Sequence, residues 1–159
     1  MQISTGLLLT MGMAGMGSQA ADVLIWKPTP SHFSVMVGEG AAGISYQMIV
    51  NAPFKGFAFD MPTYNQKDSS AKLSVFRWAG DCEKTVAGKA LHEKVFENLV
   101  DNARNWVEFP ALPAGEYLFV ISEPKGRLGC WAVTGSGTGG GNMYKDGLPC
   151  MDTLQLVLR

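Results

Sequence analysis

The feature that most constrains the fold is a short apolar unit that recurs along the chain. From residue 23 onward, runs of roughly four to eight residues rich in β-branched and aromatic types alternate with breaks of Gly, Pro, Asn or Asp. The 19 glycines and 8 prolines follow no fixed period and supply many turns, which suits numerous short strands. The sequence therefore predicts an all-β domain, built as an antiparallel two-sheet β-sandwich.

Several of these units carry further signals. Leucines at alternate positions from Leu154 onward predict a half-buried last strand. Residues 117–121 are apolar on both faces, which indicates a central strand covered on both sides. The pair Asp146-Gly147 favours a tight hairpin over residues 142–151. The expected strands are residues 23–26, 32–37, 44–50, 54–59, 72–78, 94–97, 106–109, 116–122, 128–133 and 153–158.

One stretch, residues 85–102, competes as a helix. Its apolar residues are spaced irregularly and Gly88 interrupts its start, so no sustained helical stripe forms. A short helix over residues 89–98 is the alternative. We expect a loop followed by a strand.

Length and charge bound the class of protein. A chain of 159 residues fits one domain that can bury a core without disulfides or metal. Apolar residues make up 47%, charged residues 17%, and the formal net charge is -1. This balance argues against disorder and against phosphate-driven binding of nucleic acid.

The first 22 residues are open to two interpretations. They carry no charged side chain before Asp22 and contain the small-x-small pattern Ser18-Gln19-Ala20, which is typical of an export signal. They lack the basic start of such signals, so a Gly/Met-rich first strand or arm that belongs to the domain is the alternative. Glycines interrupt the stretch, and we expect no membrane span. Residues 23–159 are then one sandwich domain.

The three cysteines, Cys82, Cys130 and Cys150, form no C-x-x-C pair. Neither a disulfide framework nor a zinc knuckle is supported. Cys130 and Cys150 bridge only if their strands are neighbours. Buried free thiols that act as small hydrophobes are the other interpretation.

A set of packing and turn motifs begins at residue 54 and reads FKGFAFDMPTYN, LSVFRW, FPALPAGEYLFVISEP and LGCW, with YKDGLP near the end. Together they resemble the accessory β-sandwich modules of jelly-roll type that are appended to secreted bacterial glycoside hydrolases. The resemblance implies a jelly-roll-like sandwich and an accessory role more than a chemistry. The chain departs from that pattern at its three cysteines.

Catalytic signatures are weak. A nucleophile activated by histidine needs a proton shuttle, and His32 and His92 lie in no recognisable nucleophile turn. Glycoside hydrolysis needs two carboxylates facing one another across a cleft, and the spacing of the Asp and Glu residues singles out no pair. We therefore expect no enzyme, with a small carboxylate-dependent glycoside hydrolase as an alternative.

Metal ligands are also sparse. Asp81, Glu83 and the pair Asp101-Asn102 are oxygen ligands of the kind that Ca²⁺ uses, but no Asp-x-Asp-x-Asp loop is present. Paired histidines that would favour zinc or copper are missing. We expect no cofactor and no catalytic metal, with a structural calcium as the open alternative.

The remaining signal is aromatic. Sugar rings stack on aromatic side chains while neighbouring Asp, Asn and Arg bind their hydroxyls. Trp106 and Trp131 are expected in the core, as tryptophans of a sandwich usually are. The expected ligand-binding residues lie in polar loops at strand ends, and they are Trp78, Tyr64, Arg77, Asp81 and Asn102.

The sequence thus favours a non-catalytic carbohydrate-binding or surface-recognition module, secreted or at an extracellular surface, whose partner is a polysaccharide or glycan. The alternative from another class is a structural subunit of an extracellular or virus-particle assembly. Such a subunit would form a homo-oligomer through strand edges or through its first 20 residues.

Overall fold

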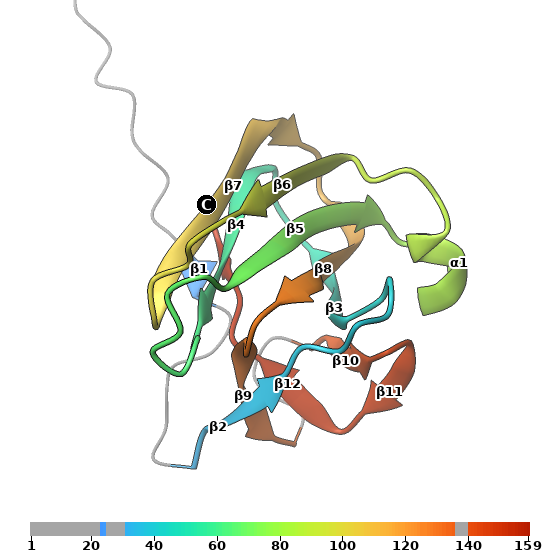
Figure 1. Cartoon of the computed structure of the whole chain (residues 1–159). Coiled ribbons are helices and arrows are strands. Elements are labelled where there is room, and N and C mark those ends of the chain that lie inside the picture. Colours follow the sequence, from blue (N-terminus) through green and yellow to red (C-terminus); the bar gives the residue numbers. More distant parts are fainter. Residues whose placement is uncertain (1–22, 25–30, 136–139) are drawn as a thin grey trace, which may run out of the picture.

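The strands form three antiparallel sheets in a computed structural model that describes residues 23–24, 31–135 and 140–159 (Figure 1). The fold is an all-β antiparallel sandwich, as the sequence predicts. The strands are β1 (Val23–Leu24), β2 (Phe33–Met36), β3 (Ile44–Val50), β4 (Phe54–Met61), β5 (Ser70–Arg77), β6 (His92–Phe96), β7 (Ala103–Leu112), β8 (Gly115–Lys125), β9 (Gly129–Thr134), β10 (Asn142–Lys145), β11 (Leu148–Cys150), β12 (Asp152–Leu154) and β13 (Val157–Leu158).

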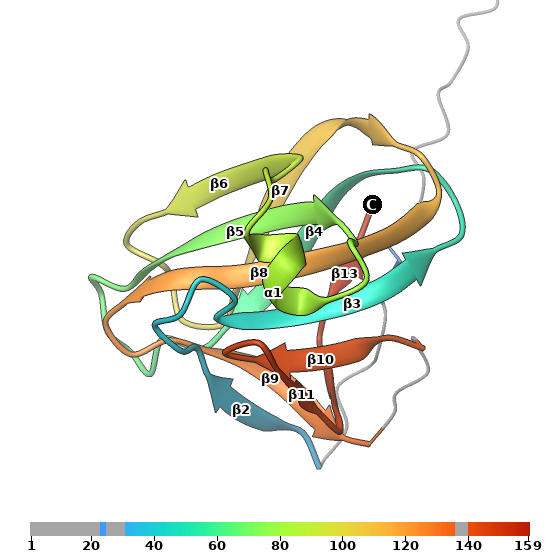
Figure 2. The same cartoon turned by 90° about the vertical axis from the view of Figure 1, so that its right-hand side faces the viewer.

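The largest sheet has six strands in the order β11-β10-β3-β8-β5-β6. A four-stranded sheet, β1-β13-β4-β7, lies behind it, and a three-stranded sheet, β12-β9-β2, lies at its lower side (Figure 2). One hydrophobic cluster draws side chains from all three sheets, and Tyr46, Phe57 and Phe119 in it are fully buried. The rings of Phe57 and Phe119 pack with their centroids 5.1 Å apart. This cluster is the core that holds the sheets together.

The last strand corrects the sequence prediction. Instead of one half-buried strand, β12 pairs with β9 and β13 pairs with β4, so the chain crosses from one sheet to another at Gln155 and Leu156. Residues 153–158 are all buried as a result. An alternation of leucines predicts one exposed and one covered face, but a segment that passes between two sheets is covered on both sides.

Strand β8 confirms the prediction of a central strand. It lies between β3 and β5, and residues 117–121 are all buried. One set of its side chains enters the main core, while Leu118 and Val120 enter a second cluster on the outer face of the sheet. The hairpin predicted over residues 142–151 is present as β10 and β11, with Asp146 and Gly147 at positive φ.

A short helix, α1 (Cys82–Val86), covers that second cluster (Figure 2). Asp81 caps it, since one of its carboxylate oxygens accepts a hydrogen bond from the Lys84 amide at 3.0 Å. The sequence alternative of a helix over residues 89–98 is wrong, because β6 occupies that stretch. The expected loop and strand are present, but the helix one turn earlier was not predicted.

Residues 1–22, whose role as signal or arm was left open, lie outside the described residues. Among the residues that the structure describes, no helix is long and apolar enough to span a membrane. All three cysteines are described, and none forms a disulfide. Cys130, buried in the core, and Cys150, half-buried, are therefore free thiols and not a bridge.

The core predicts a contrast between two truncations. Phe119→Ala should lower the free energy of unfolding by about 3–5 kcal/mol, because it empties the centre of the aromatic cluster. Val95→Ala, on an edge strand where the side chain is 59% exposed, should change it by less than about 0.5 kcal/mol. Urea titrations of both variants measure the difference, and similar losses in the two would contradict this placement of the core.

The thiols predict a second contrast. Burial raises the pKa of Cys130 strongly and that of Cys82 less, so both stay protonated and unreactive in the folded protein. A thiol reagent should label Cys150 first and the other two only after unfolding. The pKa of each of these two thiols is higher in the folded protein than in the unfolded chain. Their contribution to the free energy of unfolding is therefore fully present below about pH 8.5, and it falls as the pH rises above that value. If the folded Cys150→Ser variant reacted with the thiol reagent at the wild-type rate, the prediction that Cys82 and Cys130 are protected would be wrong.

Candidate functional site

The five residues predicted to bind ligand do not form one site. Tyr64 and Asn102 lie at the end of the sandwich where β5 begins, and the other three lie where β5 ends. A strand of eight residues spans about 25 Å, so the two groups are at opposite ends of the domain. In Figure 1, β5 runs from the left of the molecule to the right, where α1 follows it.

The group at the end of β5 has partly structural roles. Trp78 is half-buried against the second cluster, under α1. Arg77 points to the other face, with its guanidinium carbon 4.7 Å from the ring centroid of Tyr117. Asp81 is the cap of α1. The arrangement brings Trp78 and Asp81 to one face of the sheet and leaves Arg77 outside it.

The group at the start of β5 sits on two loops that are tied together. The loop after β4, residues 62–69, and the turn between β6 and β7, residues 97–102, are joined by the hydrogen bond from the Leu99 amide to the Ser69 carbonyl at 2.9 Å. One carboxylate oxygen of Asp101 accepts from the Thr63 amide at 2.6 Å and from its hydroxyl at 3.3 Å. Leu99 itself is buried in the core. These contacts hold both loops in fixed positions.

A shallow hollow of about 320 Å³ lies between the two loops. The lining side chains of Asn65, Lys67 and Asn98 are exposed and, within the described part of the chain, none of them makes a hydrogen bond. They present free donors and acceptors to solvent. The full lining is Thr63, Asn65, Gln66, Lys67, Asn98, Leu99, Val100 and Asp101.

Backbone strain gathers at the same place. Tyr64, Asn65, Asn98 and Asn102 all adopt positive φ, between 52° and 63°. Asparagine tolerates this left-handed conformation, but an aromatic residue such as Tyr64 adopts it at a cost. Strained residues of this kind cluster at binding sites, where the surrounding contacts over-determine them. We call the hollow and its two loops the loop pocket.

Contacts around Tyr64 hold it in this strained conformation. Its hydroxyl bonds that of Ser34 on β2, and the guanidinium carbon of Arg127 lies 4.7 Å from its ring centroid. Gly129 makes the approach possible, because a Cβ there would meet both hydroxyls. The Gln66 side chain also accepts a hydrogen bond from the Arg127 amide. Tyr64 is thereby fixed as a half-buried ring beside the pocket.

Two tryptophans correct the sequence prediction that they belong to the core. Trp106 is only half-buried, with the Arg159 guanidinium carbon 4.1 Å from its ring centroid. Trp131 is also half-buried, and its indole N–H donates to the Asn102 side chain at 2.9 Å. Trp131 stands between the fully buried Cys130 and Ala132 on β9, so the pleat turns it outward. Trp131 therefore lies with Tyr64 and Asn102 at the end of the sandwich where β5 begins.

Sequence reasoning therefore missed Trp131, and the period of two within residues 128–133 was the signal that would have placed it outward. It also missed Asn98 and Arg127. Asn98 precedes two apolar residues in a stretch for which a helix was the alternative. The sequence pattern therefore gave no clear signal for the turn at Asn98. Arg127 meets Tyr64 only through the pairing of distant strands, and the sequence carries no local signal for that contact.

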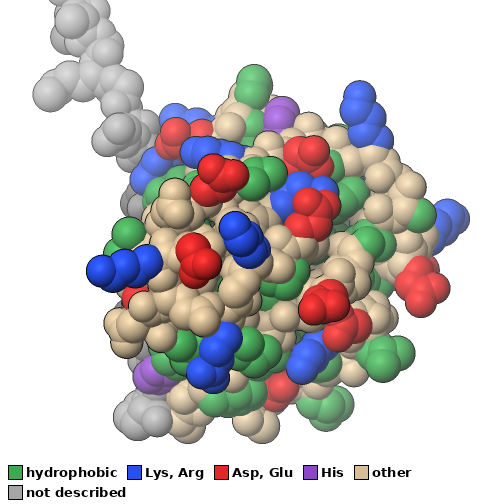
Figure 3. All heavy atoms as spheres, in the orientation of Figure 1, with side chains coloured by type: hydrophobic (Ala, Val, Ile, Leu, Met, Phe, Trp, Pro, Cys, Tyr) green, Lys and Arg blue, Asp and Glu red, His purple; other side chains and the backbone are tan. Residues whose placement is uncertain are grey.

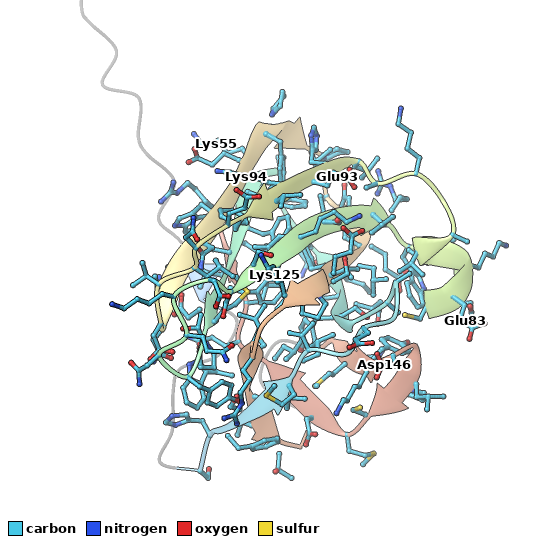
Figure 4. All side chains as sticks on the ribbon, viewed as in Figure 1. Lys55, Glu83, Glu93, Lys94, Lys125 and Asp146 are labelled. Carbon is cyan, nitrogen blue, oxygen red and sulfur yellow. The ribbon has the colours of Figure 1, made fainter. Side chains whose placement is uncertain are left out.

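Carboxylates and metal ligands are divided between the two ends. Among the calcium candidates, Asp81 and Glu83 lie at α1 while Asp101 and Asn102 lie at the loop pocket, so they cannot share an ion. The residues described hold no group of three or more His, Cys, Asp or Glu suited to a metal. A second hollow, of about 290 Å³ beside α1, contains two carboxylates, Glu83 and Asp146 (Figure 4).

Charge on the visible surface is mixed. Figure 3 shows acidic and basic side chains interspersed over the face that carries β5 and β6. Such a face gives no single-signed field for a polyanion.

Comparison of the chain with family models, with curated proteins and with solved structures gave no match.

The close packing at Tyr64 is testable by a double-mutant cycle. Gly129→Ala should destabilise the fold by about 1–3 kcal/mol, since the added methyl group meets Ser34, Tyr64 and the Val35 carbonyl. Ser34→Ala removes one of these contacts, so the pair should show a coupling of at least about 0.5 kcal/mol in thermal or urea unfolding. Strict additivity would show that Gly129 is not needed for the approach of Tyr64 to Ser34.

Proposed function

We propose that this chain is a non-catalytic carbohydrate-binding module that holds a neutral glycan in the loop pocket. The observation that carries the proposal is the set of free side chains in that pocket. The amides of Asn65 and Asn98 each offer donors and an acceptor that no other described residue occupies. Sugar hydroxyls require partners of both kinds, and amide side chains supply them without a net charge.

The surroundings of the pocket fit the same ligand class. The aromatic rings of Tyr64 and Trp131 are half-buried next to its loops, and half-exposed rings are where apolar sugar faces stack. The volume of about 320 Å³ suits one or two sugar units at a time. The fixed loops mean that little conformational entropy is lost when a ligand binds.

Charge favours a neutral ligand at this end. Lys67 and Asp101 place one basic and one acidic side chain in the lining, so their fields oppose one another. Asp101 already accepts hydrogen bonds from Thr63 and Asn102, which leaves the neighbouring amides as the free groups. A role at an extracellular surface, where polysaccharides are met, follows as part of the proposal.

The test begins with a glycan array and affinity electrophoresis on the whole chain. For a glycan that is retained, Asn65→Gly and Asn98→Gly should each weaken binding about three- to tenfold, because each removes one or two hydrogen bonds. Glycine is the right replacement, since it accepts the positive φ of both positions without strain. Circular dichroism checks that the fold is kept.

A matched control is available at the other end. Asp146→Gly replaces another short polar residue at positive φ, outside the loop pocket, and should leave the affinity unchanged. Retention of no glycan, or an equal loss in all three variants, would contradict the proposal. Release of reducing ends that Glu83→Gln abolishes would instead identify a hydrolase that uses the second hollow.

A further inference from the structure

The outer face of the six-stranded sheet carries a polar row that the loop pocket does not use. The Asn142 side chain on β10 donates to the Gln47 side chain on β3 at 2.7 Å, and Gln47 donates to the Glu116 carboxylate on β8 at 2.6 Å. Gln47 is only 6% exposed. The row crosses three adjacent strands and ends on a carboxylate whose position is fixed.

Two aromatic rings lie on the same face. Trp78 follows β5 and its amide donates to the Glu116 carbonyl at 3.0 Å, while Tyr144 lies on β10 two residues after Asn142. The ring centroids of Trp78 and Tyr144 are 5.9 Å apart, with their planes tilted by 35°. Both rings are half-buried against the second cluster and half open to solvent. They form a fixed platform whose inner side is already packed.

The electrostatics of this platform are negative. Burial raises the pKa of Tyr144, and Cys82, Asp81 and Glu116 act in the same direction. Glu116 lies directly across from Trp78, since the Trp78 amide donates to its carbonyl. Within the described part of the chain, neither Asp81 nor Glu116 forms an ion pair. The guanidinium of Arg77 does not neutralise them, because it stacks on Tyr117 at the core side of the sheet.

We propose that this platform, Trp78 and Tyr144 beside the anchored Glu116, binds an organic cation, either a protonated amine or a quaternary ammonium group. Aromatic faces attract such cations, and a nearby carboxylate that forms no ion pair with a described residue adds to that attraction. The Gln47 hydrogen bond holds the carboxylate in place beside the rings. A neutral ligand would leave the charge of Glu116 uncompensated and would gain only the stacking.

The platform is separate from the loop pocket, and the two proposals do not depend on one another. They lie at opposite ends of β5, and no residue is shared.

The experiment is a titration of the whole chain with choline, followed by the indole N–H resonances in NMR spectra. 3,3-Dimethyl-1-butanol serves as the neutral ligand of the same shape. Choline should shift the Trp78 resonance, assigned with Trp78→Phe, and should bind at least about fivefold more tightly than the neutral analogue. Added sodium chloride should weaken the binding of choline and not that of the analogue.

Three variants separate the effect of charge from that of structure. Glu116→Gln keeps an oxygen that can accept from Gln47, so the row can persist, but it should weaken choline binding at least about threefold. Glu93→Gln, which removes a carboxylate on the edge strand β6 (Figure 4), should have no effect. Asn98→Gly should have none either, even if glycan binding fails.

Three results would overturn the inference. They are an absence of any shift at Trp78, equal affinities for choline and its neutral analogue, and unchanged binding in Glu116→Gln with the fold intact.

Discussion

Both faces of β8 are buried, and this double burial sets the positions of the other sheets and of α1. Its side chains reach the main core on one side and the second cluster on the other, so each face of the six-stranded sheet needs a cover. The four-stranded and three-stranded sheets cover the inner face, and α1 with the turns beside it covers part of the outer face. The crossing of the chain at Gln155 and Leu156 joins the two inner sheets and closes the core.

That arrangement also decides where binding surfaces can form. The inner face is closed by the core, which leaves the loop ends and the part of the outer face that α1 does not cover. At the loop end, asparagines in left-handed conformations present free amides. On the outer face, the rings of Trp78 and Tyr144 rest on packed side chains and stay half open. We propose a neutral ligand at one end and a cation at the other, because their charged neighbours differ.

The sequence predicted the strands well, because alternation and turn residues are local signals. Residues 44–50 coincide with β3, and Asp146-Gly147 marked the hairpin. The prediction from the sequence failed where contacts between distant parts of the chain determine the structure. Leu154 and its neighbours were read as one strand because alternation cannot show a change of sheet. The helix after Asp81 has only five residues, too few for a periodic stripe, so the sequence predicts a ligand-binding carboxylate where the structure has a helix cap.

The candidate site was predicted less well than the fold, for the same reason. Tyr64 and Asn102 do belong to one end of the domain, but their links to Arg127 and Trp131 depend on strand pairing that one sequence does not reveal. Trp78, Arg77 and Asp81 are neighbours in sequence, and the pleat of β5 sends Arg77 to the opposite side from Trp78. Polar loops near aromatic residues therefore identified the two regions of the candidate sites. They did not show which residues meet in each region.

We propose that the loop pocket, and not the sheet face, receives a neutral glycan. The test is to measure the backbone amide shifts of the whole chain with an oligosaccharide that the glycan array identifies. We predict shifts confined to residues 62–67 and 97–102 and to the neighbourhood of Arg127 and Trp131. Shifts centred on Trp78 and Tyr144, with the loop residues unchanged, would contradict the claim.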